Sequence, residues 1–228
     1  MKSIDPQNIF IIIAVYNEAR SFPDVLDSIG KYGYTIVVVD DGSEDGSAII
    51  AESCGAVVLR HIINLGQGAA LQTGIEYARL KNAPIVVTYD ADGQFEASEI
   101  TRVVAPLLKK EADVVLGSRF LGNVTDISFF RKMVLKIGIM FTYIFSNIYL
   151  TDTHNGFRAF NRKSMEYITI THNRMSHASE ILDKIKKNNL KYIEVPVSVR
   201  YHSYAKSKGQ STMNFINIIS RLIFDKLI

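Results

Sequence analysis

The stretch that decides the fold is Ile85-Val86-Val87-Thr88-Tyr89-Asp90-Ala91-Asp92-Gly93-Gln94. Its short apolar run is typical of a strand in a parallel sheet that is covered on both faces. Asp90 and Asp92 are two residues apart, so an extended backbone directs both carboxylates to the same side. The two carboxylates repel each other unless a cation lies between them, and hard oxygen ligands suit Mg²⁺ or Mn²⁺, with Gln94 as a further ligand. The alternative is an ordinary polar turn after a strand, because Asp-x-Asp is a common tripeptide.

Apolar runs and amphipathic segments alternate along the first half of the chain. We expect strands at residues 9–15, 35–39, 56–59, 85–89 and 112–117, and helices at residues 24–29, 44–52, 69–80 and 99–110. Ser21 and Ser98 are the expected N-caps of the first and the last of these helices. The alternation predicts an α/β fold with a mostly parallel central sheet and helices on both faces. A final strand at residues 192–197 is expected at a sheet edge, because Pro196 has no amide hydrogen to donate.

Acidic residues follow most of these strands, at the edge where ligands bind in open α/β sheets. The expected strand ends are Tyr16-Asn17-Glu18, Asp40-Asp41-Gly42, Asp90-Ala91-Asp92 and Gly117-Ser118-Arg119. Such an edge would repel a polyanion unless a divalent cation were bound, which is a second argument for a metal. The sequence contains no P-loop motif and no G-x-G-x-x-G after the first strand, which argues against P-loop proteins and dinucleotide-binding dehydrogenases. Gly66-Gln67-Gly68 opens a helix, either as a tight loop or as a direct ligand contact.

Composition and charge narrow the class of protein further. With 228 residues, 47% of them hydrophobic and 21% charged, the chain is ordinary for one globular domain. Its net charge of +3 is not gathered into a patch of basic and aromatic residues, so we expect no nucleic-acid partner. Cys54 is the single cysteine, which excludes an intrachain disulfide and favours a reducing compartment. Residues 1–8 do not have the pattern of a signal peptide, and no run of about 20 uncharged apolar residues predicts a spanning helix.

Five short motifs follow one another along the chain. They are Ile-Ala-Val-Tyr-Asn-Glu (13–18), Val-Val-Asp-Asp-Gly-Ser (38–43), Asn-Leu-Gly-Gln-Gly-Ala-Ala (64–70), Asp-Ala-Asp-Gly-Gln (90–94) and Gly-Ser-Arg (117–119). In this order and spacing the chain resembles the family 2 glycosyltransferases, especially the branch typified by dolichyl-phosphate mannose synthase and bacterial polyprenyl-phosphate sugar synthases. The resemblance covers roughly residues 8 to 200, and it implies the GT-A-type fold of nucleotide-diphospho-sugar transferases.

The resemblance also implies a donor site for a nucleotide-diphospho-sugar. Its nucleotide-binding positions fall on Ala14, Tyr16, Glu18, Val39, Asp41, Asp90, Ala91 and Lys206. Ala14 departs from the family pattern, which usually has proline at this position. Asp90 and Asp92, with Gln94, would hold Mg²⁺ or Mn²⁺ against the diphosphate, which makes Asp92 a catalytic candidate. The metal would stabilise the charge that grows on the departing nucleoside diphosphate, and attack from the opposite face would invert the anomeric centre.

The resemblance also implies the chemical class of the acceptor, through two arginines. Arg119 and Arg131 match positions that look like acceptor-phosphate binders in the lipid-phosphate branch. We therefore predict transfer to a polyprenyl phosphate, dolichyl or undecaprenyl, by a peripheral enzyme at the cytoplasmic membrane face. Such an acceptor is already an anion, so it needs guanidinium groups to orient it and no general base.

Two alternatives stay open. The acceptor could be a sugar hydroxyl in cell-surface polysaccharide synthesis, with Glu180 as the catalytic base. Glu180 is equally well explained as a first-turn residue, favoured by the dipole of a helix that starts near residue 175 and runs to residue 187. The chain could also be a nucleotide-binding subunit without catalysis that anchors a membrane partner.

The second half of the chain should contain the acceptor side. We expect one catalytic domain over residues 1–212, with a nucleotide-sugar half at 1–119 and an acceptor half with a lid loop at 120–212, followed by an amphipathic helix at 213–228. Residues 127–150 have helical spacing and a basic start, which fits a membrane-interface helix, a core helix or a dimer helix. The basic loop at 200–209 resembles the family's mobile segment that closes over the diphosphate, with a solvated linker as the alternative. The C-terminal helix should cover a neighbour, a membrane surface or a partner subunit, so a small membrane-protein partner or a homo-oligomer is possible.

A further segment resembles the acid-x-x-x-Gly-Phe-Arg pattern of the family, Asp152-Thr153-His154-Asn155-Gly156-Phe157-Arg158. Gly156 permits a tight turn. We expect Arg158 to form a structural pair with Asp152, with contact to phosphate as the alternative.

Overall fold

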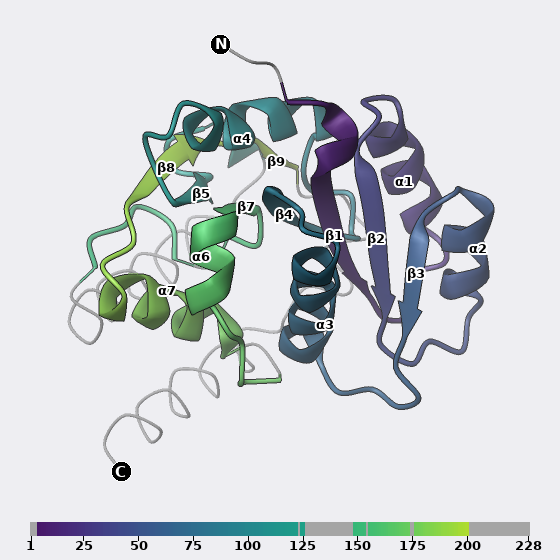
Figure 1. The fold of residues 1–228 in the computed structure, drawn as a ribbon. Helices are drawn as coiled ribbons and strands as arrows, with labels where there is room; N and C mark the ends of the chain where they lie inside the picture. Colours follow the sequence, from purple (N-terminus) through teal and green to yellow (C-terminus); the bar gives the residue numbers. More distant parts are fainter. Residues whose placement is uncertain (1–3, 123, 126–147, 154, 174–175, 201–228) are drawn as a thin grey trace.

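The computed structural model describes residues 4–122, 124, 125, 148–153, 155–173 and 176–200 (Figure 1). The strands of these residues are β1 (Ile9–Val15), β2 (Thr35–Asp40), β3 (Val57–Arg60), β4 (Ile85–Asp90), β5 (Val114–Ser118), β6 (Val124–Thr125), β7 (Arg158–Asn161), β8 (Tyr192–Pro196) and β9 (Val199–Arg200). The helices are η1 (Pro6–Asn8), α1 (Phe22–Gly30), α2 (Ser47–Ser53), α3 (Gln67–Leu80), η2 (Ala97–Glu99), α4 (Ile100–Leu108), α6 (Arg162–Tyr167) and α7 (His177–Lys187).

The main sheet of the described residues has seven strands in the order β3-β2-β1-β4-β7-β5-β8. All neighbouring pairs are parallel except those of β7, which runs antiparallel to both β4 and β5. The predicted α/β fold with a mostly parallel sheet is therefore confirmed, and β8 lies at an edge as the position of Pro196 indicated. β6 and β9 form a separate two-stranded sheet.

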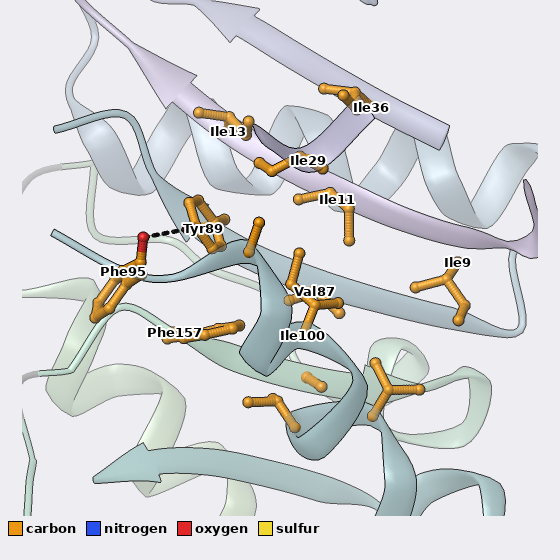
Figure 2. Close-up of a cluster of buried hydrophobic side chains, with 14 of the residues drawn as sticks. Ile9, Ile11, Ile13, Ile29, Ile36, Val87, Tyr89, Phe95, Ile100 and Phe157 are labelled. Atoms are coloured by element: carbon orange, nitrogen blue, oxygen red, sulfur yellow. Dashed lines mark hydrogen bonds between the residues drawn. The ribbon is translucent and has the colours of Figure 1, made fainter. Parts of the chain in front are cut away.

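Two buried clusters lie on opposite faces of the sheet. The side chains of β1 alternate between them, so that Ile11 and Ile13 belong to one cluster and Ile12 to the other. Residues of α1, α2 and α4 complete the first cluster, and residues of α3, α6 and α7 complete the second (Figure 1). Figure 2 shows the first cluster, in which Ile29 of α1 and Ile100 of α4 lie with the side chains of β1 and β4. Burial of both faces explains why the strands are continuous apolar runs.

Local structure differs from the expectation in three places. α2 begins at Ser47 and not at residue 44, because Asp45 accepts a hydrogen bond from the Ser47 N–H at 3.1 Å and Gly46 has a φ of 85°. Ser21 occupies the N-cap position of α1 as predicted, although its side chain makes no capping bond, whereas a 3₁₀ turn places Glu99 and not Ser98 at the N-cap of α4. β7 was not expected, because a four-residue strand that begins with a buried arginine has no apolar pattern.

The helices predicted at residues 127–150 and 213–228 lie outside the described residues, apart from residues 148–150. The loop predicted at 200–209 is described at Arg200 alone. Within the described part of the chain, no helix is long and apolar enough to cross a membrane.

Candidate active site

Three of the predicted nucleotide-binding residues lie side by side across the sheet. Ala14 on β1 is the register partner of Val39 on β2 and of Asp90 on β4. Because these strands are parallel, their carboxyl ends meet at one edge, and the loops that follow them converge there. The fold thus brings together motifs that are far apart in the sequence.

The loop after β1 is held against the loop after β2. Asn17 adopts a positive φ of 54° and accepts the Glu44 N–H through its Oδ1 at 2.9 Å. The Glu18 N–H donates to Ser47 Oγ at 3.1 Å. Above these contacts the Tyr16 side chain is 47% exposed, so its ring is accessible to a ligand at this edge.

Asp41 organises the loop between β3 and α3. Its buried carboxylate accepts the N–H groups of Leu65 at 2.9 Å and Gly66 at 2.7 Å. His61 Nδ1 lies 2.7 Å from Asp41 Oδ1, and His61 Nε2 lies 2.9 Å from Thr73 Oγ1 on α3. Sequence reasoning did not identify His61, because its partners become neighbours only in the folded chain. The role of Asp41 in a base pocket stays a prediction.

Asp90 ends β4, and Asp92 lies two residues further on. Burial raises the pKa of Asp90, the Asp92 carboxylate raises it further, and the charges of Arg158 and Arg119 act in the opposite direction. Asp92 Oδ1 accepts the Gln94 N–H at 3.0 Å. The end of β4 therefore concentrates negative charge, as the sequence predicted, and buried arginines balance part of it.

The backbone around Asp92 is held on two sides. The Tyr89 hydroxyl donates to the Phe95 carbonyl oxygen at 2.7 Å, and Phe157 packs against both rings with centroid distances of 5.2 and 5.1 Å (Figure 2). From β9, the Arg200 N–H donates to the Gln94 carbonyl oxygen at 2.9 Å. These contacts fix the position of the loop from Ala91, which is buried, to Phe95.

Two residues that were not among the predicted site residues contact Asp90. Gln67 Nε2 donates to Asp90 Oδ1 at 3.3 Å. Gly156 lies so close that a Cβ built on it would be 2.6 and 2.7 Å from the two Asp90 oxygens. The Gly156 carbonyl oxygen accepts the Thr88 hydroxyl at 2.6 Å, which keeps this backbone against β4. The reason for glycine at position 156 is therefore close approach to Asp90, whereas the sequence suggested a tight turn.

The N-terminus of α3 is closed by the chain itself. The N–H groups of Gly68 and Ala69 donate to the Asn173 carbonyl oxygen at 2.8 and 3.3 Å. A methyl group at Gly68 would overlap with the carbonyl oxygen of His172. Of the two interpretations of Gly66-Gln67-Gly68, these contacts support the tight loop, because a ligand at the Gly68 amide would have to displace a backbone carbonyl.

Arg119 and Asp152 form a buried ion pair. Arg119 Nε donates to Asp152 Oδ2 at 2.6 Å, and the Arg119 backbone N–H donates to the same oxygen at 3.1 Å. Arg158 instead donates to the carbonyl oxygens of Asn155 at 2.9 Å and Thr153 at 3.3 Å. The expected direct pair of Arg158 with Asp152 is thus replaced by backbone contacts, and Arg158 acts on Asp152 through its charge.

Glu180 holds the segment before α7. Its buried carboxylate accepts the Thr171 N–H, the Thr171 hydroxyl at 2.6 Å and the His172 N–H at 2.9 Å. Burial acts to raise the pKa of Glu180, but these hydrogen bonds outweigh it and hold the pKa below its ordinary value. A carboxylate with a lowered pKa and three donors is a weak candidate for a general base.

A divalent cation fits the residues at the end of β4. Asp90 and Asp92 supply two carboxylates, and Mg²⁺ or Mn²⁺ commonly takes one or two protein carboxylates together with phosphate oxygens and water. A bound cation would relieve the repulsion that raises the pKa of Asp90. Within the described residues no cluster of three or more acidic, histidine or cysteine side chains could hold a metal. The predicted residues Arg131 and Lys206 lie outside the described part of the chain.

Solved structures share this architecture. Glucosyl-3-phosphoglycerate synthase from Mycobacterium tuberculosis, crystallised with Mn²⁺, uridine diphosphate and glucosyl-3-phosphoglycerate, matches with a TM-score of 0.73. The match covers 96% of this chain and 78% of that chain at 19% sequence identity. At this identity the likeness shows the fold alone, and it confirms the predicted GT-A-type fold.

Curated relatives are more similar in sequence. An uncharacterized protein of Methanocaldococcus jannaschii is 35% identical over an alignment of 232 positions that covers 100% of this chain and 96% of that protein. The UDP-N-acetylglucosamine–dolichyl-phosphate N-acetylglucosaminyltransferase of Methanococcus voltae is 30% identical over an alignment of 245 positions that covers 96% of each chain. The undecaprenyl-phosphate 4-deoxy-4-formamido-L-arabinose transferase of Shewanella sediminis is 28% identical and is covered over 65% of its length. The sequence profile described as "Glycosyl transferase family 2" matches residues 10–169. The chain therefore belongs to glycosyl transferase family 2, as its five motifs predicted.

Proposed function

We propose that this protein transfers a sugar, with inversion, from a nucleotide diphosphate sugar to a polyprenyl phosphate at the cytoplasmic face of a membrane. The observation that carries the proposal is the carboxylate pair Asp90 and Asp92 at the end of β4, where the charges of Arg158 and Arg119 act on Asp90. The carboxylates suit a metal-bound diphosphate, and the arginines suit an anionic acceptor. The full-length relative named as a dolichyl-phosphate N-acetylglucosaminyltransferase supports the lipid-phosphate acceptor.

The donor would lie along the carboxyl edge of β1, β2 and β4. Ala14 and Val39 are neighbours there, and the exposed ring of Tyr16 is positioned to cover a base or ribose. Glu18 and Asp41 are the polar groups of the same edge, and Lys206 would approach from the lid loop. Ala91 is buried and directly follows Asp90, and a bound diphosphate would approach the backbone at this residue.

Asp90 and Asp92, with Gln94, would hold Mg²⁺ or Mn²⁺, and this ion would neutralise the charge on the departing nucleoside diphosphate. The chain's own residues set the geometry of the site. The hydrogen bond from Gln67 orients the Asp90 carboxylate, and the missing side chain of Gly156 gives it room. The aromatic contacts of Tyr89 and Phe95 keep Asp92 at a fixed distance from the strand end.

The contacts of Glu180 favour a phosphate acceptor over a sugar hydroxyl. A hydroxyl acceptor needs a base that can take its proton, whereas a phosphate already carries a nucleophilic oxygen anion. Glu180, the candidate base, is engaged by Thr171 and His172. Arg119 and Arg131 would orient the acceptor phosphate, whose oxygen attacks the anomeric carbon as the bond to the diphosphate breaks.

The test is a transfer assay with the full chain, Mn²⁺, radiolabelled UDP- or GDP-sugars and undecaprenyl or dolichyl phosphate in detergent. We expect label in the organic-extractable lipid, a loss on the order of 100-fold for Asp92→Asn, and retained activity for Glu180→Gln. Transfer to sugar hydroxyls alone, lost in Glu180→Gln, would establish the hydroxyl-acceptor alternative. No transfer or nucleotide-sugar hydrolysis with any donor, despite nucleotide binding, would indicate a catalytically idle subunit.

A further inference from the structure

We infer that Glu194 on β8 is a positioning residue for the acceptor arginine Arg119, and that it acts through Asp152. The inference rests on the proposed function only in giving Arg119 a phosphate to bind. Hydrogen bonds connect Glu194 to Thr151 and Asp152, and Asp152 to the guanidinium group of Arg119, whose charge acts on Asp90. We call this set of contacts the relay.

The first step of the relay is the fixed orientation of Arg119. Its Nε and its backbone N–H donate to one and the same oxygen, Oδ2 of Asp152, at 2.6 and 3.1 Å. Two donors of one residue on one acceptor leave the side chain little rotational freedom. The Asp152 side chain is 1% exposed, so water does not compete for this oxygen. The position of Asp152 therefore determines the position of the guanidinium group.

The second step fixes Asp152. Glu194 accepts the Asp152 N–H at 3.1 Å and the Thr151 N–H at 2.9 Å, and its Oε1 also accepts the Thr151 hydroxyl at 2.9 Å. The Thr151 hydroxyl is 2.6 Å from Ser118 Oγ, and Ser118 immediately precedes Arg119. The loop that carries Asp152 is thus tied both to β8 and to the end of β5. Because β5 and β8 pair in parallel register, with Leu116 opposite Glu194, the sheet sets this geometry.

The contact uses both oxygens of Glu194 as hydrogen-bond acceptors. Oε2 accepts the Thr151 N–H, and Oε1 accepts the same N–H together with the Thr151 hydroxyl and the Asp152 N–H, so both oxygens act as acceptors. In a glutamine of the same shape, the amide nitrogen would face the Thr151 N–H, donor against donor. The Oε1 position would still accept both N–H groups, but two N–H donors 2.9 Å apart repel each other, which displaces the loop or costs stability. Glu194→Gln is therefore a small substitution that acts on Thr151 and, through the loop, on the position of Asp152.

The chain offers a matched control in Glu99. This buried carboxylate also holds a loop, by accepting the Ser198 N–H at 2.8 Å and the Ser198 hydroxyl at 3.2 Å. Ser198 lies between β8 and β9, and it does not contact Arg119 or Asp152 in any of these bonds. Glu99→Gln therefore reproduces the loss of a loop-holding carboxylate whose own hydrogen bonds, to Ser198 and Arg102, do not include Thr151, Asp152 or Arg119.

The first measurement is hydrogen exchange of the Arg119 Nε–H in the ¹⁵N-labelled full chain, with the resonance assigned by its absence in Arg119→Lys. We expect this proton to exchange on the order of 10-fold faster in Glu194→Gln than in the wild type, and at the wild-type rate in Glu99→Gln. Asp152→Asn should exchange at least as fast as Glu194→Gln, because it changes the acceptor itself. Equal exchange in Glu194→Gln and in the wild type would overturn the inference.

The second measurement uses the transfer assay. In Glu194→Gln we expect the KM for polyprenyl phosphate to rise on the order of 10-fold while the KM for the nucleotide sugar stays at the wild-type value. Suppose that Glu194→Gln and Glu99→Gln lose the same thermal stability and raise the KM for polyprenyl phosphate by the same factor. Glu194 would then have a purely structural role, and the inference would be wrong. If the wild type transfers no sugar, the proposed function fails, and the exchange rate of the Arg119 Nε–H still decides the positioning role.

Discussion

Gly156 determines how much room the Asp90 carboxylate has. A methyl group in its place would lie 2.6 Å from Asp90 Oδ2, which is closer than atoms approach without moving. The carboxylate is the movable partner, so the strain is relieved by turning Asp90 away from its present position. We predict that Gly156→Ala folds with nearly wild-type stability but loses activity on the order of 10- to 100-fold, measured by urea denaturation and the transfer assay.

The control for this prediction is Gly30→Ala. Gly30 lies at the end of α1, and no atom is within 4 Å of the position that its Cβ would take. This variant should keep both stability and activity. Wild-type activity in Gly156→Ala would show that the orientation of Asp90 does not matter to the reaction.

Glu180 should make the protein sensitive to acid. Its pKa is lowered in the folded state, so its ionised form stabilises the fold above the unfolded pKa, near pH 4, and this contribution is lost as the pH falls through the folded pKa. We predict that the free energy of unfolding falls less steeply below about pH 4 in Glu180→Gln than in the wild type, although the variant is less stable at pH 7. Chemical denaturation between about pH 3 and pH 7, roughly the range over which carboxylates titrate, measures this difference.

Glu52→Gln serves as the reference for Glu180→Gln, because Glu52 is an exposed glutamate on α2. Its stability should follow the wild-type curve at every pH. Parallel curves for the wild type and Glu180→Gln would mean that Thr171 and His172 do not lower the pKa of this carboxylate in solution.

At the scale of elements, the start of α3 contacts both the segment before α7 and the end of β4. Its first amides bind the Asn173 carbonyl oxygen, and its first residue, Gln67, donates to Asp90. A side chain at Gly68 would force the backbone of residues 172 and 173 away from the helix. We predict that Gly68→Ala lowers the free energy of unfolding by about 2 kcal/mol, because the overlapping atom belongs to the backbone and cannot turn aside. Thermal denaturation, with Gly30→Ala as the control, measures the loss; an unchanged midpoint would contradict the contact.

The sequence predicted the elements far better than the contacts between them. β1, β2 and β4 are unbroken apolar runs, so burial on both faces was readable from local sequence, and so were the acids that follow them. Helix starts were less predictable, since Asp45 and Glu99 form tertiary contacts that compete with capping. β7 could not be read from its sequence, because its pairing with β4 and β5 is what makes four residues a strand.

In the candidate site too, local features were predicted from the sequence and tertiary contacts were not. Asp90 and Asp92 were found from their spacing at a strand end, which is a local property. Gln67, Gly156 and Glu194 were not assigned to it, because each acts through a residue that is distant in sequence. The motifs around Gln67 and Gly156 carried a signal, but the contact of each residue with Asp90 required the folded chain.

At the scale of the molecule, β7 joins the donor edge to the acceptor side. It runs antiparallel between β4 and β5, so the loop that precedes it arrives at the carboxyl ends of both strands. That loop brings Gly156 to Asp90 and Asp152 to Arg119. The fold thereby places Asp90, Asp92 and Arg119 at one edge, as the proposed transfer from a nucleotide diphosphate sugar to a phosphate would need.

The most direct test of the central claim is a calorimetric titration of UDP and GDP into the full chain, with Mn²⁺ and with EDTA. The account predicts that one of these nucleotides binds with Mn²⁺, that EDTA weakens this binding on the order of 100-fold, and that Asp92→Asn binds as weakly with Mn²⁺ as the wild type does with EDTA. Equal affinity in Mn²⁺ and EDTA, or wild-type affinity in Asp92→Asn, would contradict a cation held by Asp90 and Asp92.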